Sequence, residues 1–238
     1  MNLLKKTACL LTVFCTTTIL SIHASASSFD KTAQLANNGD IKAQYELGNY
    51  YRSDKEGNKD YSKAIKWYLK AANQGDSLAQ LKLAEMYHYI LPLRELNRIE
   101  AIRWYQKAAD QGLIEAQYNL GFIYYNGQGV KKNYNKAFEW YLKAAEQGDF
   151  KAQSNIGAMY RDGEGVSKNR EKAIEWFEKS ANQGYAAAQY QLALMYDFCY
   201  TLEPDFAKAS KWYQQAAEQN YLPPYFICTY TISHSGEN

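Results

Sequence analysis

The residues best suited to metal or acid–base chemistry stand far apart in this chain. After the N-terminal 26 residues the histidines are His88 and His234, and neither belongs to an H-E-x-x-H motif or accompanies a C-x-x-C motif. A zinc site needs three or four ligands that the fold brings together, usually at recognisable spacing. We therefore expect no metal site and no other cofactor.

Nucleophilic chemistry has equally little support. The tetrapeptide S-F-D-K, Ser28 to Lys31, has the Ser-x-x-Lys spacing of penicillin-recognising enzymes, but their S-D-N and K-T-G motifs are missing. The glycine-rich N-G-Q-G-V at 126–130 lacks the Lys-Ser/Thr pair of a phosphate-binding loop. We predict a protein that is not an enzyme. The alternative is a cell-wall-directed hydrolase or hydrolase inhibitor, β-lactamase-like or peptidoglycan-related, which would need converging carboxylates or a Ser/Lys pair.

The first 26 residues have the pattern of a signal peptide. Lys5 and Lys6 form a basic start, a 16-residue apolar run containing five threonines follows, and Ala24-Ser25-Ala26 is a small-x-small cleavage site. A membrane-spanning helix needs about 20 apolar residues, and this run is shorter. We expect cleavage after Ala26 and a mature protein that is exported, either periplasmic or secreted.

Removal of this segment leaves a chain without net charge. The full chain has 27 basic and 25 acidic residues, two of the basic residues are Lys5 and Lys6, and no acid precedes Asp30. The mature chain therefore carries 25 residues of each sign. Nucleic-acid binders usually need a clustered basic surface, so we expect no nucleic-acid partner.

One segment recurs through the chain at intervals of 36 or 37 residues. Each copy has a tryptophan followed by a second aromatic residue, an Ala-Gln pair, and in four copies a closing glycine. The tryptophans are Trp67, Trp104, Trp140, Trp176 and Trp212. Because a catalytic group need not occur once in every repeat, these residues are expected to be structural.

Each copy is predicted to contain two helices. In the third copy Ala116, Leu120, Ile123 and Tyr124 recur at helical spacing in a first helix, called helix A. Residues 137–145 show the same apolar spacing in a second helix, called helix B. The predicted fold class is therefore all-α.

Small residues mark the helix ends and the contacts between helices. Gly148 and its equivalents suit the left-handed position that follows helix B, and Asn220 is the tolerant substitute in the fifth copy. One position of helix A is always glycine or alanine, which lets helices approach while aromatic rings fill the space beside them. These residues are Gly48, Ala84, Gly121, Gly157 and Ala193. A single hairpin cannot bury both faces, so the copies are expected to stack.

The pattern A-Q-x-x-L-G-x-x-Y … G-x-G-V-x-x-x-x-x-K-A-x-x-W-Y-x-K-A-A-x-Q-G resembles the Sel1-like repeat family, a relative of the tetratricopeptide repeat. The resemblance implies a right-handed α/α superhelical solenoid that serves as a protein-binding scaffold. Together with the signal-peptide pattern, it predicts the following organisation: a signal peptide (1–26), an N-terminal capping helix (27–40), five repeats (41–76, 77–113, 114–149, 150–185 and 186–220), and a C-terminal capping helix and tail (221–238).

The same resemblance predicts a binding surface. In tetratricopeptide-type solenoids the A helices line the concave face, and their non-core positions meet the partner. The corresponding side chains differ from repeat to repeat, as partner contacts do, and include Ser154 and Ala158 in the fourth repeat. Some of the rings could instead pack against the next repeat, an alternative that stays open for Tyr118 and Tyr190. The predicted contact residues are Tyr45, Asn49, Arg52, Leu81, Glu85, His88, Tyr118, Phe122, Tyr125, Arg161, Tyr190 and Leu194.

The two cysteines that remain after cleavage are Cys199 and Cys228. Cys228 aligns with Leu192, a core position of helix A, and Cys199 lies seven residues beyond Leu192, about 10 Å along a helix. With neighbouring helices about 8–10 Å apart, an ideal stack holds the two Cα atoms beyond disulfide reach. The spacing argues against a bridge, which would require the last helix to slide or bend.

These observations predict an exported scaffold or adaptor that binds a protein or peptide partner on its concave face. The resemblance to bacterial members of the family implies a role in envelope signalling or in contact with host cells. No membrane span is expected once the signal peptide has been removed.

Overall fold

The computed structural model describes residues 28–53, 57, 59–90, 95–197 and 204–221. The chain divides into two compact units, Met1–Leu93 and Arg94–Asn238, which are described separately. The predicted signal peptide, both mature cysteines and residues 222–238 lie outside the described residues.

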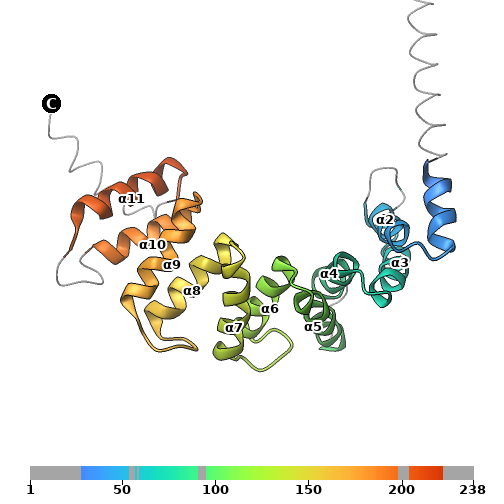
Figure 1. Cartoon of the computed structure of the whole chain (residues 1–238), viewed down its shortest axis with the longest axis horizontal. Helices are drawn as coiled ribbons and strands as arrows, with labels where there is room; N and C mark the ends of the chain where they lie inside the picture. The colour runs from blue at the N-terminus through green and yellow to red at the C-terminus, as the bar shows by residue number, and fades with distance from the viewer. Residues whose placement is uncertain (1–27, 54–56, 58, 91–94, 198–203, 222–238) are drawn as a thin grey trace, which may run out of the picture. The chain divides into compact units, whose positions relative to one another are not determined.

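All regular structure in the described residues is helical (Figure 1). The first unit holds a helix over residues 28–37, followed by α2 (Ile41–Arg52), α3 (Tyr61–Asn73), α4 (Ser77–Glu85) and the π-helical turn η1 (Met86–Ile90). The second unit holds α5 (Glu95–Asp110), α6 (Ile114–Asn126), α7 (Tyr134–Glu146), α8 (Phe150–Asp162), α9 (Arg170–Asn182), α10 (Ala186–Tyr196) and α11 (Phe206–Glu218). The even-numbered helices are the predicted A helices, and the odd-numbered ones from α3 onward are the B helices.

Short polar side chains set where the helices begin. Asp149 precedes α8, and its Oδ1 accepts a hydrogen bond of 2.6 Å from the backbone N–H of Ala152. Asn133 caps α7 in the same way through the N–H of Lys136, at 3.0 Å. Such caps satisfy backbone donors that the first turn of a helix leaves unpaired. The corner between one repeat and the next is therefore encoded locally.

The residue after helix B adopts the left-handed conformation that the sequence predicts. Gly148 has a φ of 96°, and Asn220, which replaces glycine in the fifth repeat, has a φ of 57°. Only glycine takes such angles without steric cost, and asparagine is among the most tolerant of the others. After Gly148 the chain turns directly into α8, which is capped by Asp149.

The small position that recurs in helix A lies against the second aromatic residue of helix B in the repeats that carry glycine there. A Cβ atom added to Gly121 would lie 2.5 Å from a ring carbon of Tyr141, and one added to Gly157 would lie 2.8 Å from a ring carbon of Phe177. The absence of a side chain lets the ring lie directly on the helix backbone. This confirms the predicted role of small residues in helix approach.

The second ring of each Trp-aromatic pair, rather than the tryptophan, is the more deeply buried one. Tyr141 is 2% exposed and Phe177 is fully buried, whereas Trp140 is 9% exposed and Trp176 is half-buried. The tryptophans lie at the edge of the core, where a lysine one turn later covers the ring. Four such lysines lie 4.0–4.1 Å from the ring centroids: Lys70, Lys107, Lys143 and Lys179. Trp104 and Trp140 are buried, and Trp67, Trp176 and Trp212 are partly exposed.

A chain of glutamine amides joins the repeats. Gln153, from the Ala-Gln pair of α8, donates at 3.1 Å to the carbonyl oxygen of Ala145 at the end of α7. Gln183, from the corner after α9, donates at 2.8 Å to Oε1 of Gln153 and at 3.1 Å to the carbonyl oxygen of Gly148. The same pattern occurs around Gln44, Gln117 and Gln189. Buried amides of this kind must be paired, so the repeated glutamines fix the register of each hairpin on the next.

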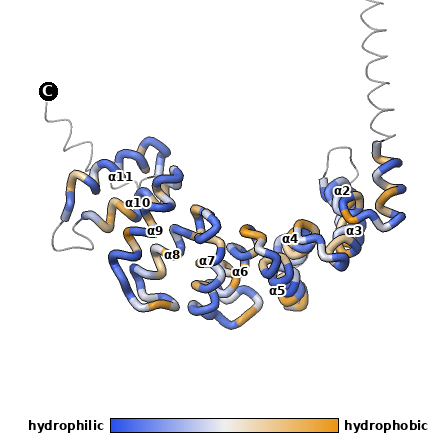
Figure 2. The backbone as a smooth tube through the Cα atoms, in the orientation of Figure 1, coloured by the Kyte–Doolittle hydropathy of each residue, from blue (hydrophilic) through white to orange (hydrophobic). Residues whose placement is uncertain are grey.

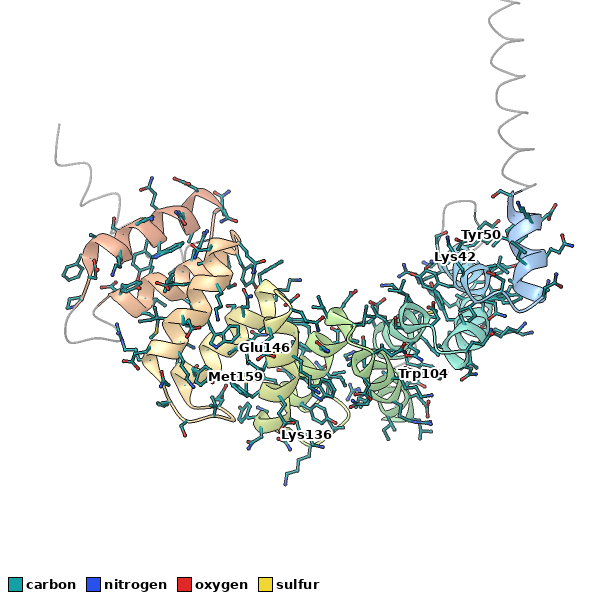
Figure 3. All side chains as sticks on the ribbon, viewed as in Figure 1. Lys42, Tyr50, Trp104, Lys136, Glu146 and Met159 are labelled. Carbon is teal, nitrogen blue, oxygen red and sulfur yellow. The ribbon has the colours of Figure 1, made fainter. Side chains whose placement is uncertain are left out.

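Hydrophilic and hydrophobic residues are interspersed along the described part of the chain (Figure 2). Met159 lies among the helices of the second unit, whereas Lys136 lies at its outer side (Figure 3). Among the described residues, no helix has both the length and the apolar character that a membrane crossing requires.

Candidate partner-binding face

The first unit uses several predicted contact residues for its own packing. The ring of Tyr45 lies 5.9 Å from that of Tyr68, whose hydroxyl donates to Oδ1 of Asn49 at 2.8 Å. Glu85 forms an ion pair of 3.0 Å with Lys82 on the same helix. Arg52, at the end of α2, is exposed. This part of the predicted face is therefore largely occupied by internal contacts.

Two predicted contact residues of the first unit are corrected by the structure. Leu81 is 1% exposed and His88 is 7% exposed, so neither offers useful side-chain area to a partner. Leucine has no polar end to keep in water, and at this position it enters the core. His88 lies in the π-helical turn η1, where the extra residue per turn rotates the following side chains away from the α-helical stripe on which the prediction was based.

In the second unit, α6 presents three aromatic residues at the predicted positions. Tyr118, Phe122 and Tyr125 are all half-buried. Tyr118 packs on Tyr141 of its own repeat with a centroid separation of 5.6 Å, and Phe122 packs on the core cluster around Tyr141. Tyr118 therefore takes part in internal packing, while part of each of the three side chains remains exposed.

The hydroxyl of Tyr125 connects two repeats. It donates a hydrogen bond of 2.6 Å to Oε2 of Glu164, in the loop that follows α8. Burial, together with the neighbouring Glu164 carboxylate, raises the pKa of Tyr125 above its ordinary value. The phenol therefore stays protonated at physiological pH and remains a donor to Glu164.

The remaining predicted residues lie on α8 and α10. Arg161 donates to the side-chain oxygen of Gln191 on α10 and pairs with its neighbour Asp162 at 2.6 Å. Tyr190 lies 5.8 Å from the ring of Tyr213, and Leu194 packs on the same cluster. The first contact joins α8 to α10, and the contacts of Tyr190 and Leu194 join α10 to α11. Ser154, which was also expected at this face, is buried at 8% exposure and offers little area to a partner. In the second unit we use the name A-helix face for Tyr118, Phe122, Tyr125, Ala158, Arg161, Tyr190 and Leu194.

A hollow of about 400 Å³ lies between α6 and the start of α8, next to the A-helix face. Of the predicted contact residues, Tyr118 lines this hollow. The other lining residues were not predicted as contacts: Ile114, Glu115, Asn119, Asp149, Phe150 and Lys151. Ile114 lies one turn before Tyr118, and Phe150 is its equivalent in the next repeat, so the spacing of the face could have been extended to both.

An aromatic edge continues from this hollow along the corners of the second unit. Phe150 lies 5.0 Å from Tyr185, the residue before α10, and Tyr221 lies 6.2 Å from Tyr190. Tyr185 stands where α8 has its capping Asp149, and α10 begins without a side-chain cap. An aromatic residue in place of a cap was the sequence signal for this edge.

The hairpins, the Gly-aromatic contacts and the glutamine chain recur with the period of one known repeat. The model of the Sel1 repeat matches residues 41–76, 77–113, 114–149, 150–185 and 186–221. The chain belongs to the Sel1 repeat family. The predicted all-α repeat fold is thereby confirmed.

Two solved structures of Sel1 repeat proteins are similar to this chain. A Sel1 repeat protein from Oxalobacter formigenes is 32% identical with a TM-score of 0.73, over 84% of this chain and 83% of that one. A protective antigen of uropathogenic Escherichia coli strains, which displays an SLR fold, is 35% identical with a TM-score of 0.72 over 80% of this chain. The match covers only 40% of that antigen, so this chain spans less than half of its length. Among curated proteins, none matches this chain.

Membership of the Sel1 repeat family indicates a general class of function. Sel1 repeat proteins are generally scaffolds for protein interaction, and the family is generally non-catalytic. The hydrolase alternative has no support from these relatives. Ser28 and Lys31 are both exposed on the helix over residues 28–37. Within the described part of the chain, no three His, Cys, Asp or Glu side chains form a group that could hold a metal ion.

Proposed function

We propose that this Sel1 repeat protein is a non-catalytic scaffold or adaptor whose A-helix face binds a protein or peptide segment. The observation that carries the proposal is the set of aromatic residues on α6, which keep part of their surface exposed beside a hollow. Partly exposed aromatic rings with polar groups around them are the usual anchors of protein interfaces.

The distribution of side chains along the repeats supports the same face. Positions that pack the two helices of a repeat, such as the Gly-aromatic pairs, and positions that join successive repeats, such as the glutamines, keep their residue type. Positions on the A-helix face change from repeat to repeat, from Phe122 on α6 to Ala158 on α8 and Leu194 on α10. Packing alone would favour the same residue at each of them. Variation at these partly exposed positions is what recognition of one particular partner requires.

We further propose that the protein is exported and acts in the envelope or in contact with host cells. The pattern of the first 26 residues supports export. The similarity to a protective antigen of uropathogenic Escherichia coli is compatible with that setting. Export predicts a mature chain that begins at Ser27, which N-terminal sequencing of protein from periplasmic and culture fractions would check. A chain that retains Met1 in those fractions would contradict cleavage.

The substitution Phe122→Lys is expected to reduce partner binding about tenfold or more, because it places a charge among the aromatic anchors of the face. Capture of partners from envelope or host-cell extract on immobilised protein, quantified by mass spectrometry against wild type, measures the loss. The aliphatic stem of lysine can still lie along the core cluster, so the fold is expected to be kept.

The matched control is Leu142→Lys on α7. Leu142 and Phe122 are both half-buried and pack on the same core cluster, but Leu142 belongs to helix B. We expect similar melting temperatures for the two variants and loss of partners only for Phe122→Lys. Equal retention of partners by both variants would refute binding at the A-helix face, and equal loss would assign the effect to folding.

A further inference from the structure

The hollow between α6 and α8 combines flat aromatic or apolar walls with carboxylates. Tyr118 and Phe150 supply rings from two successive repeats, and Ile114 supplies an aliphatic wall. Glu115 lies in the first turn of α6, and Asp149 caps α8. The hollow has a volume of about 400 Å³, at the small end of the range for ligand-binding pockets. It suits one long side chain of a bound segment rather than a whole helix.

The carboxylates of this hollow have unused hydrogen-bonding capacity. Oδ1 of Asp149 accepts a hydrogen bond from the N–H of Ala152. Within the described residues, Oδ2 of Asp149 has no hydrogen-bond partner. Glu115 is exposed and makes no side-chain hydrogen bond or ion pair within the described chain. Asn119 adds an amide to the same wall. The positive end of the α8 dipole is already capped by Asp149, so the hollow offers acceptors to a ligand.

This charge arrangement is specific to α6. Among the five described A helices, only α6 has an acid in its first turn. The equivalents of Glu115 are Lys42 in α2 and Lys151 in α8. Lys151 also lies at the rim of the hollow, where its Nζ is 5.9 Å from the centroid of the Phe150 ring. The local balance of Glu115, Asp149 and Lys151 is one negative charge.

We propose that this hollow receives an arginine side chain of the partner segment, an inference that rests on the proposed function. The planar guanidinium stacks on aromatic faces and pairs with carboxylates through two parallel N–H groups, which a lysine ammonium cannot do. Tyr118 and Phe150 provide the faces, and Glu115 and the free oxygen of Asp149 provide the acceptors. The arginine thereby orients the segment whose neighbouring residues lie on the A-helix face.

Three blocked tripeptides test the proposal directly, with arginine, citrulline or glutamate between two glycines. Citrulline keeps the shape of arginine without its charge. We expect the arginine peptide to bind ¹⁵N-labelled protein about fivefold or more tightly than the citrulline peptide. Amide shifts should be confined to Glu115, Asn119 and residues 149–152. The equivalent corner around Lys42 in the first unit serves as an internal negative control.

Substitutions then assign the charges. The double variant Glu115→Gln with Asp149→Asn keeps the side-chain shapes and a capping oxygen at 149, so its melting temperature should change little. We expect this variant to bind the arginine and citrulline peptides equally, and Lys151→Glu to bind the arginine peptide more tightly. Equal binding of all three peptides to wild type, or tighter binding of the glutamate peptide, would overturn the proposal.

The two proposals fail separately. If Phe122→Lys loses its partner while the arginine peptide produces no shifts at the hollow, the A-helix face stands and the arginine pocket is wrong. If the peptide binds at the hollow and Phe122→Lys still captures every partner, the pocket exists but the A-helix face is not the binding surface.

Discussion

Replacement of Tyr141 by alanine is expected to lower the free energy of unfolding by about 3–5 kcal/mol, the range for loss of a buried aromatic ring. The ring is 2% exposed and lies directly on the backbone at Gly121, so its removal leaves a cavity that neighbouring side chains cannot fill. Destabilisation should also reach adjacent repeats, because stacked repeats depend on their shared interfaces.

The neighbouring Trp140 gives the matched comparison. It is the larger residue, but it lies at the edge of the core, is 9% exposed and is covered by Lys143. Truncation there opens a site that water can enter, so Trp140→Ala is expected to cost less than Tyr141→Ala. Urea unfolding of both variants measures the difference in unfolding free energy. The comparison uses the same dependence of that free energy on urea concentration (m-value) for both variants. A larger loss for Trp140→Ala would show that the tryptophan is the main core residue of the repeat.

The substitution Gly121→Val is expected to destabilise the protein by about 1–3 kcal/mol through overpacking. Its Cβ alone would lie 2.5 Å from a ring carbon of Tyr141, and the ring cannot move away without displacing the next hairpin. Two repeats carry alanine at this position, Ala84 and Ala193, so the repeat can accommodate a single methyl group there. The branched valine is not expected to be tolerated.

A double-mutant cycle isolates this contact. In the Tyr141→Ala background the space beside residue 121 is open, so Gly121→Val should cost much less or become neutral there. Urea unfolding of the two single variants and the double variant gives the coupling energy. Additive effects would mean that the valine is destabilising for a reason other than its contact with Tyr141, such as the lower helix propensity of a β-branched residue.

The repeat itself was predictable from the sequence because its signals are local. The apolar spacing at residues 116–124 and 137–145 specifies two helices, and Gly148 and Asp149 end one helix and begin the next within two residues. A pattern that occurs five times must make the same contacts five times. Fold class and the packing role of Gly121 therefore followed from periodicity, which needs no knowledge of how far each side chain is buried.

The candidate site was predictable only in part. Tyr118, Phe122 and Tyr125 lie together on one side of α6 because residues four and three apart on a helix share a face. Leu81 and His88 were wrong as contact residues, because burial depends on neighbouring helices and on the π-helical turn that rotates His88.

Local patterns predicted the two-helix repeat, its corners and the stripe of variable residues, because each depends on neighbours within a few residues. The tertiary structure decided which ring of each aromatic pair lies deepest, how Gln183 joins Gln153, and that Glu115 and Phe150 line one hollow. Gln153 and Gln183, and likewise Glu115 and Phe150, are 30 or more residues apart along the chain. The first distance depends on how α8 packs on α9, and the second on how one hairpin stacks on the next.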